Sequence, residues 1–257
     1  MTRRAVLVTG LSGLIGGAVL QHLGGTYALR GLNRRAVPGV PCHRADIADL
    51  EAIQPAFAGA DAVVHLAANA SMSAPFEDTL KANVVGTYNV FEAARRAGVK
   101  RVVYASSGAT VSGCERDLPY RALVTGCGKE VGEWPMLTHE TPVRPSGLYG
   151  VSKVWGEALA RHYADAHGMS MLCLRIGHVT AEDRPLSPRD YSVWCSQRDI
   201  VRMIELCLQA PDTLRFDVFF VVSDNAWGYR DLEHARAVLG FVPRDSAETY
   251  RAGPGGT

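Results

Sequence analysis

An apolar run near the start of the chain leads straight into a glycine-rich turn, in the segment VLVTGLSGLIG over residues 6–16. Gly10 permits a sharp turn after a buried strand, Gly13 lets a phosphate approach the backbone, and Gly16 lets the next helix lie close to the sheet. The unpaired N–H groups and the positive dipole end of that helix favour an anion. The segment therefore predicts a dinucleotide site, with pyrophosphate contacts from Gly10, Ser12, Gly13, Leu14, Ile15 and Gly16.

Strand-like and helix-like patterns alternate along the chain, which is typical of an α/β fold with a doubly wound parallel sheet, the Rossmann fold. Apolar runs predict strands near 5–9, 27–32, 40–45, 62–66, 101–106, 171–176 and 216–222. Helical periodicity predicts helices near 14–23, 49–57, 76–97, 147–167, 199–210 and 230–239. We expect one domain over 1–257, in which residues 1–176 mainly bind the cofactor and residues 177–250 complete a substrate pocket. The polar segment 112–146 is expected to be a loop, and the tail 253–257 to be disordered.

Composition excludes several classes of protein. A chain of 257 residues with 47% hydrophobic residues can bury a large core, and its net charge of +1 gives no bias towards nucleic acid or a membrane. We expect no membrane span and no signal peptide, because the first strand begins almost at residue 1. The six cysteines show no metal-ligand spacing, so we expect no metal, a cytoplasmic location, and no functional disulfide between Cys114 and Cys127. The apolar surface of the predicted 76–97 helix favours a homodimer.

A second chemical motif is Tyr149-Gly-Val-Ser-Lys153. On a helix the side chains at positions i and i+4 share a face, so an ammonium from Lys153 would lie near the Tyr149 phenol. We expect the positive charge to lower the phenol pKa and to favour a phenolate that removes a hydroxyl proton. Lys153 can also donate a hydrogen bond to a nicotinamide ribose, so it is expected to bind cofactor as well.

Together these motifs resemble the short-chain dehydrogenase/reductase superfamily, in its extended, epimerase/dehydratase-like branch. The resemblance covers nearly the whole chain and rests on TGLSGLIG (9–16), DI (46–47), HLAA (65–68), NVVGT (83–87), YASS (104–107) and YGVSK (149–153). It implies that Asp46 and Ile47 flank the adenine and that Asn83 orders the helix beside the site. It also implies that the cofactor cleft is lined by Leu66, Ala67 and Ala68.

The same resemblance implies catalytic roles. Ser107 would hydrogen-bond the substrate hydroxyl, Tyr149 would act as the base, and Lys153 would be its electrostatic partner. Gly108, in the expected substrate pocket, stands where some relatives place the catalytic hydroxyl. Ser106 and Thr110 therefore remain alternatives to Ser107.

The C-terminal region is short, with about eighty residues after Ile176, which favours a small sugar over a nucleotide sugar. The segments 144–153, 175–177, 188–194 and 239–241 look most like those of uronate dehydrogenases, which oxidise the C1 hemiacetal of a hexuronic acid to a lactone. This resemblance implies that Arg189 holds the substrate carboxylate. His178 stands where those enzymes have a serine that touches the substrate, so it is a candidate for substrate contact or for loop packing. A serine at 71 or 73 would also contact the sugar, and Ser73 is our candidate.

The residues after the second predicted strand bear on cofactor choice. NAD-dependent relatives place an acidic residue here, whereas this chain has Asn33 followed by Arg34 and Arg35. A neutral amide beside two guanidinium groups can pair with a 2′-phosphate, so we expect NADP to be preferred and NAD to be tolerated. The alternative is that both arginines simply point into solvent.

The sequence thus predicts an NAD(P)-dependent oxidoreductase that acts on a small sugar or sugar acid. An epimerase or dehydratase that retains its cofactor, or a non-catalytic NADP-binding regulatory protein, are the alternatives. Other polar residues are expected to be structural: His65 a hydrogen-bonded core histidine, and Asp199 a helix cap. The structural alternative for Arg189 is an ion pair with Asp190 or Asp183.

Overall fold

Seven strands form one sheet in the order β3-β2-β1-β4-β5-β6-β7, and every strand pair in it is parallel. The structure is a computed structural model that describes residues 3–251. The strands are β1 Ala5–Thr9, β2 Ala28–Asn33, β3 Cys42–Arg44, β4 Ala62–His65, β5 Arg101–Ser107, β6 Ser170–Ile176 and β7 Phe216–Val221. The strand order reverses direction between β1 and β4, as in a doubly wound Rossmann fold, so the predicted fold class is confirmed.

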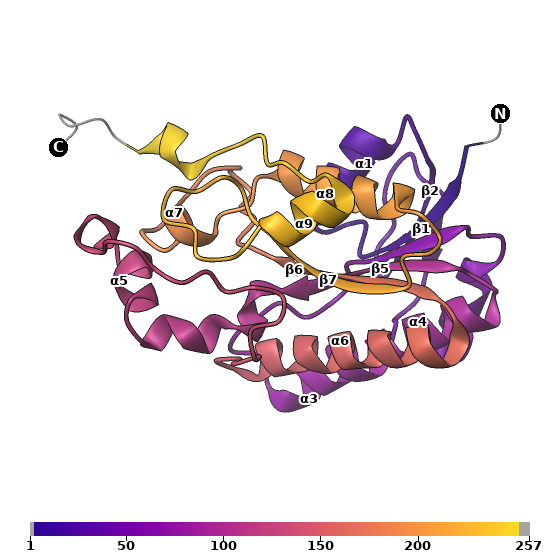
Figure 1. Cartoon of the computed structure of the whole chain (residues 1–257). Helices are drawn as coiled ribbons and strands as arrows, with labels where there is room; N and C mark the ends of the chain where they lie inside the picture. Colours follow the sequence, from indigo (N-terminus) through magenta and orange to yellow (C-terminus); the bar gives the residue numbers. More distant parts are fainter. Residues whose placement is uncertain (1–2, 252–257) are drawn as a thin grey trace.

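Helices cover both faces of this sheet. They are α1 Leu14–Leu23, α2 Leu50–Ile53, α3 Phe76–Thr79, α4 Gly86–Arg96, α5 Tyr120–Val124, α6 Leu148–His167, α7 Asp190–Val193, α8 Gln197–Gln209 and α9 Glu233–Leu239. In Figure 1, α3, α4 and α6 lie on one side of the sheet, and α1, α8 and α9 lie on the other. Alternation along β1 explains the two layers: Val6 and Val8 belong to the core cluster under α1 and α8, whereas Leu7 belongs to the cluster under α4 and α6.

Four segments differ from the expected pattern. The predicted 76–97 helix is present but is interrupted by a π-helical stretch at Leu80–Val85. The 49–57 helix tightens into a 3-10 helix at Gln54–Phe57, which contains Pro55 in its first turn. The segment 112–146 is not all loop, because it contains α5 and the 3-10 helices Ser112–Arg116 and Gly128–Glu130. Helix α7 was not predicted. These elements are three to five residues long, too short for helical periodicity to show in a sequence.

His65 and Asp199, two polar residues expected to be structural, are both buried. His65 is a buried core histidine, bonded to Thr9 Oγ1 (2.7 Å) and Thr87 Oγ1 (3.2 Å), and burial lowers its pKa to about 3. The prediction that Asp199 caps a helix was wrong. Ser196 caps α8 by accepting from the Asp199 N–H, while the Asp199 carboxylate accepts from the Arg244 N–H (2.8 Å) and from Ser223. Asp199 thereby fixes the C-terminal segment to α8.

All six cysteines are free, Cys114 and Cys127 included. None of the helices within residues 3–251 has the length and apolar character needed to cross a bilayer. Leu80, Val85 and Tyr88 each expose more than a third of their surface on the α3–α4 side, and the homodimer they suggest stays a prediction. The expected disorder of the tail 253–257 concerns residues outside the described range.

Candidate active site

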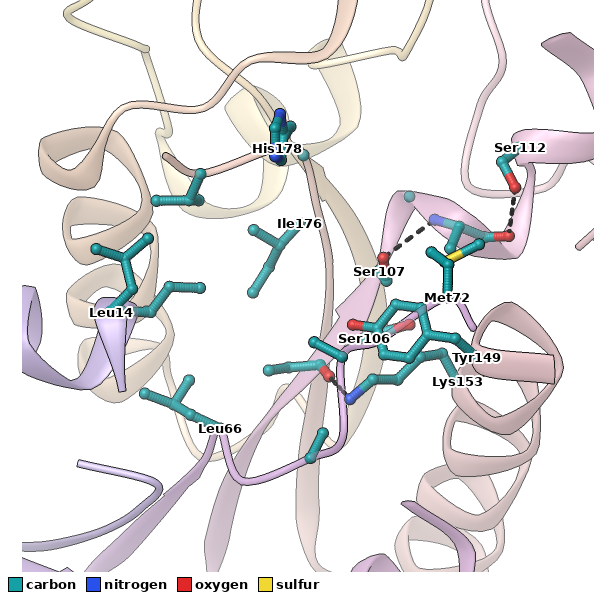
Figure 2. Close-up of a pocket in the computed structure, with 18 of the residues that line it drawn as sticks. Leu14, Leu66, Met72, Ser106, Ser107, Ser112, Tyr149, Lys153, Ile176 and His178 are labelled. Atoms are coloured by element: carbon teal, nitrogen blue, oxygen red, sulfur yellow. Dashed lines mark hydrogen bonds between the residues drawn. The ribbon is translucent and has the colours of Figure 1, made fainter. Parts of the chain in front are cut away.

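Two adjoining cavities, of about 730 and 930 Å³, lie at the carboxyl ends of the strands. They share lining residues from the turn after β1 and from the loop after β4: Gly10, Gly13, Leu66, Ala68 and Ala70. The 730 Å³ cavity, which we call the catalytic cavity, extends over β5, β6 and α6, as Figure 2 shows. The 930 Å³ cavity, which we call the nucleotide cavity, extends over the ends of β2 and β3. This is where open parallel sheets bind ligands, next to the point where the strand order reverses.

The glycine turn joins the two cavities and has the geometry that a pyrophosphate needs. Gly10 has φ +74°, and a Cβ atom there would lie 2.8 Å from the Ala67 backbone nitrogen. A Cβ atom on Gly16 would lie 2.5 Å from the Gly10 carbonyl oxygen, so α1 can approach the turn only because residue 16 is glycine. Helix α1 begins at Leu14 and has no acidic residue in its first turn, so its N–H groups face no competing carboxylate of that turn. These residues fit a dinucleotide.

The nucleotide cavity is lined by Asn33, Arg34, Arg35, Asp46 and Ile47, and also by Ala67 and Lys81. Asn33 is buried at the end of β2; its Oδ1 accepts from the Ser12 N–H (3.4 Å) and its Nδ2 donates to Cys42 Sγ (3.0 Å). Arg34 and Arg35 are both exposed at the rim. A backbone hydrogen bond from Ala48, together with the Lys81 ammonium 3.2 Å away, lowers the pKa of Asp46. Asp46 is therefore a carboxylate at neutral pH.

Asn83 connects the cofactor side of the site to α6. Its Oδ1 accepts from the Asn69 N–H (2.7 Å), and its Nδ2 donates to the Asn69 carbonyl (3.0 Å) and to Ser152 Oγ (3.1 Å). The loop after β4 is thus fixed against the helix that carries Tyr149 and Lys153.

Tyr149 and Lys153 both line the catalytic cavity from the first turns of α6. Lys153 Nζ donates to the Ala105 carbonyl (2.7 Å) and lies 5.6 Å from the centre of the Tyr149 ring; Figure 2 shows the two side chains side by side. Burial lowers the pKa of Lys153 to about 8, although the Glu157 carboxylate acts in the opposite direction.

The expectation of a lowered phenol pKa was wrong. Burial raises the pKa of Tyr149, and the hydrogen bond with Ser107 offsets this only in part. The physical reason is burial, which disfavours the charged phenolate and which the spacing of two residues on a helix does not reveal.

Three hydroxyl groups near Tyr149 were candidates to assist it. Ser106 Oγ donates to Glu157 Oε1 (2.5 Å), and Thr110 Oγ1 donates to the Ser107 carbonyl (2.9 Å), so both hydrogens are used inside the protein. Ser107 Oγ accepts from the Ala109 N–H (3.1 Å), which leaves its own hydrogen to donate towards Tyr149 in the cavity. The geometry therefore favours Ser107.

Glu157 continues the face of α6 that carries Tyr149 and Lys153, one turn further along. Its carboxylate accepts two hydrogen bonds from Arg175 on β6 (3.0 and 2.9 Å), besides the one from Ser106 on β5. Both members of this ion pair are almost fully buried. Helix α6 is thereby bonded to the two strands whose ends form the catalytic cavity.

Replacing Lys153 with methionine should lower kcat/KM about ten- to hundredfold at pH 7, since an ammonium at this separation stabilises a phenolate by roughly 1.4–3 kcal/mol. The loss should shrink as the pH rises through about 8, because the wild-type lysine is then neutral too. The measurement is the pH profile of kcat/KM for both proteins between pH 6 and 10. Lys100→Met, which removes an exposed lysine far from the cavities, is the control. A constant ratio across the pH range would contradict this electrostatic role.

The outer end of the catalytic cavity is rich in charge. Arg189 donates to both carboxylate oxygens of Glu115, each at 2.7 Å, and Tyr229 donates to the same carboxylate at 2.6 Å. The ion pair with Asp190 or Asp183, considered for Arg189 from sequence, was wrong. Burial alone would raise the pKa of Glu115, but the arginine bonds outweigh it and the net pKa is lowered, so Glu115 is ionised.

His178 lines the same cavity and is half exposed. Its Nδ1 lies 2.6 Å from Asp190 Oδ1, and the other oxygen of Asp190 accepts from the backbone N–H groups of Leu186 and Ser187. His178 is therefore oriented by a buried carboxylate and presents its other ring nitrogen away from Asp190.

Ser71 and Ser73 lie 3.2 Å apart, Oγ to Oγ, at the exposed tip of the loop after β4. Neither lines the catalytic cavity or the nucleotide cavity, whereas Met72 between them lines the catalytic cavity. Contact of Ser73 with a substrate stays a prediction. No cluster of metal-ligating side chains is found within residues 3–251.

Three residues of the site were not predicted from the sequence. Glu157 could have been found, because it follows Lys153 by four residues on an obvious helix. Glu115 and Arg230, which also line the catalytic cavity, come from a polar segment and from the C-terminal region. They carry no local motif, and only the tertiary fold brings them to Gly108 and Arg189.

A Rossmann sheet, a glycine turn under a helix N-terminus, and a Tyr–Lys pair beside Ser107 define an extended short-chain dehydrogenase/reductase. Comparison with known proteins supports this class: residues 6–198 match the NAD dependent epimerase/dehydratase family. The chain belongs to this family.

Among its relatives is a NAD-dependent glucose-6-phosphate dehydrogenase of Haloferax volcanii, 34% identical over 95% of each chain. The L-arabinose 1-dehydrogenase (NAD(P)(+)) of the same organism is 31% identical over 95% of this chain and 98% of the relative. The crystal structure of uronate dehydrogenase from Agrobacterium tumefaciens superposes with a TM-score of 0.81, at 34% identity, over 99% of this chain and 93% of that one.

Proposed function

We propose that this protein oxidises a small sugar or sugar acid at its C1 hemiacetal, with transfer of a hydride to a nicotinamide cofactor. The observation that carries the proposal is the geometry of Ser107, Tyr149 and Lys153, which face one cavity that is continuous with the glycine turn. Relatives named for a sugar phosphate, an aldose and a uronate support the substrate class.

Each residue of the site has a role in the reaction. Ser107 hydrogen-bonds the substrate hydroxyl, and the Tyr149 phenolate takes its proton as the C1–H hydride leaves and the lactone carbonyl forms. Lys153 stabilises the phenolate below about pH 8. When bound, the nicotinamide cofactor supplies the hydride acceptor. The glycine turn and Asn83 would position it, and residues 177–250 would complete the substrate side.

The substrate we propose is a hexuronate. Arg189 and Arg230 bring two guanidinium groups to the catalytic cavity, which has a volume of about 730 Å³. A cavity of this size suits a monosaccharide beside the reactive end of a cofactor.

The test is the accumulation of reduced cofactor, followed by its absorbance, with glucuronate, galacturonate, glucose, arabinose and glucose 6-phosphate and with each of NAD and NADP. Stoichiometric reduction with a sugar acid supports the proposal. Conversion of a sugar without net cofactor reduction would instead assign the protein to the epimerases or dehydratases. Absence of any turnover with the whole panel would count against it.

We further propose that NADP is preferred and NAD tolerated, because no carboxylate stands at position 33 and two exposed arginines line the rim of the nucleotide cavity. The Asn33→Asp/Arg34→Leu variant should shift the ratio of kcat/KM for NADP over NAD at least tenfold towards NAD. Arg44→Leu, an exposed arginine outside the cavity, should leave the ratio unchanged. A tenfold or greater preference of the unmodified protein for NAD would show that the arginines do not bind the phosphate.

A further inference from the structure

Arg230 is a buried arginine whose guanidinium reaches the catalytic cavity. Its backbone is fixed at a β-bridge to Leu137, where the Leu137 N–H donates to the Tyr229 carbonyl (2.7 Å). The side chain is only 2% exposed, yet its Nε has no hydrogen-bond partner within the described residues. Its one hydrogen bond is a long one, from Nη2 to the Gly108 carbonyl (3.4 Å). The Nη1 atom also makes no hydrogen bond within the described residues and, unlike Nε, is not fully buried, so Nη1 is the donor that a ligand in the cavity can reach.

Gly108 makes room for this guanidinium. A Cβ atom at position 108 would lie 2.2 Å from Arg230 Nη1, so no residue with a side chain could stand there without displacing the arginine. Gly108 directly follows Ser107, which places the charge of Arg230 beside the reacting end of the cavity. The glycine that departs from the family pattern is thus explained by an arginine from the far end of the chain.

The charge of Arg230 is poorly compensated. Both oxygens of Glu115 are already bonded to Arg189, and the distance from Glu115 Oε1 to Arg230 Nη2 is 3.8 Å. The other carboxylate of the cavity, Asp190, is committed to His178 and to backbone N–H groups. With Lys153 included, three cationic side chains and two carboxylates line the cavity, so it carries an excess positive charge when His178 is neutral.

We propose that Arg230 is a substrate-binding residue that receives an anionic substituent of the sugar, a carboxylate or a phosphate. Arg189 then acts mainly through Glu115, by neutralising a carboxylate that would otherwise repel the same substituent. A guanidinium with free donors pairs with such an anion through two parallel hydrogen bonds. The inference rests on the proposed function for the sugar, but it concerns binding and can be measured without turnover.

The experiment is calorimetric titration of the protein, saturated with reduced cofactor so that no oxidation occurs, with glucuronate, glucose 6-phosphate and glucose. Arg230→Met keeps an unbranched apolar side chain and removes the guanidinium charge. We expect it to weaken binding of at least one of the two anionic sugars ten- to hundredfold, and binding of glucose less than threefold. Which anion is affected distinguishes a carboxylate from a phosphate. Arg236→Met, an exposed arginine on α9 that lines neither cavity, is the matched control.

A second variant tests the inference even if the Arg230→Met protein fails to fold. Glu115→Gln removes the negative charge and frees Arg189, so it should tighten binding of the same anionic sugar three- to tenfold, a gain that loss of structure cannot produce. The inference is overturned if Arg230→Met weakens glucose and the anions equally, or if Glu115→Gln leaves anion affinity unchanged or lowers it. If the anionic sugar binds as expected but no sugar reduces the cofactor, the proposed function is wrong, whereas the assignment of Arg230 as an anion-binding residue is supported.

Discussion

Tyr149→Phe should lose nearly all turnover and still bind cofactor. The substitution removes only the phenolic oxygen, which in the proposed reaction accepts the substrate proton, while the ring keeps its packing on α6. Lys153 keeps its bond to the Ala105 carbonyl, and the glycine turn is untouched. Initial rates with the best sugar measure the first effect, and the change in protein fluorescence on cofactor addition measures the second.

Tyr163→Phe is the matched control for this experiment. Tyr163 is on the same helix and its hydroxyl also makes a hydrogen bond, to Glu92 (3.2 Å), but it lines neither cavity. This control should keep its rate within about threefold. A Tyr149→Phe protein that keeps a tenth or more of the wild-type rate would exclude Tyr149 as the general base.

Arg189→Met should raise KM for a uronate by one to two orders of magnitude, on the order of 1.5–3 kcal/mol. Two roles give this same result. In the first role, which the resemblance to uronate dehydrogenases implies, Arg189 is a direct ligand of the carboxylate. In the second, Arg189 neutralises Glu115, so its loss exposes the Glu115 carboxylate to the substrate.

The double variant Arg189→Met/Glu115→Gln separates the two roles. If Arg189 acts by neutralising Glu115, the second change restores most of the lost affinity; if Arg189 binds the substrate itself, KM stays high. Arg184→Met, an exposed arginine outside both cavities, is the control. Should neutral aldoses be the better substrates and Arg189→Met be without effect, the hexuronate proposal is wrong.

The sequence predicted the sheet, its main helices and the cofactor side of the site because these follow from local patterns. The glycine turn can be recognised from the spacing of three glycines, and the Tyr–Lys pair from two residues four positions apart on one predicted helix. Even the interrupted 76–97 helix was found, since a π-helical stretch hardly changes the apolar pattern.

The substrate side could not be predicted in the same way. Glu115, Arg189 and Arg230 come from three segments separated by more than forty residues each, and their pairing depends on how the C-terminal region folds over the sheet. The direction of the Tyr149 pKa shift also depends on how deeply the phenol is buried, and the spacing of residues along a helix gives no information on burial.

The bonds of Glu157 have a consequence for the energetics of cofactor binding. Because the Glu157 carboxylate accepts from Ser106 on β5 and from Arg175 on β6, buried hydrogen bonds hold the helix that carries Tyr149 and Lys153 against both strands. A cofactor that binds would then spend none of its binding free energy on bringing Tyr149 and Lys153 into position. Its apparent affinity would not be lowered by a small population of the binding-competent conformation. We therefore expect that the sugar-binding segments can change, by evolution or by engineering, without displacing Tyr149 and Lys153.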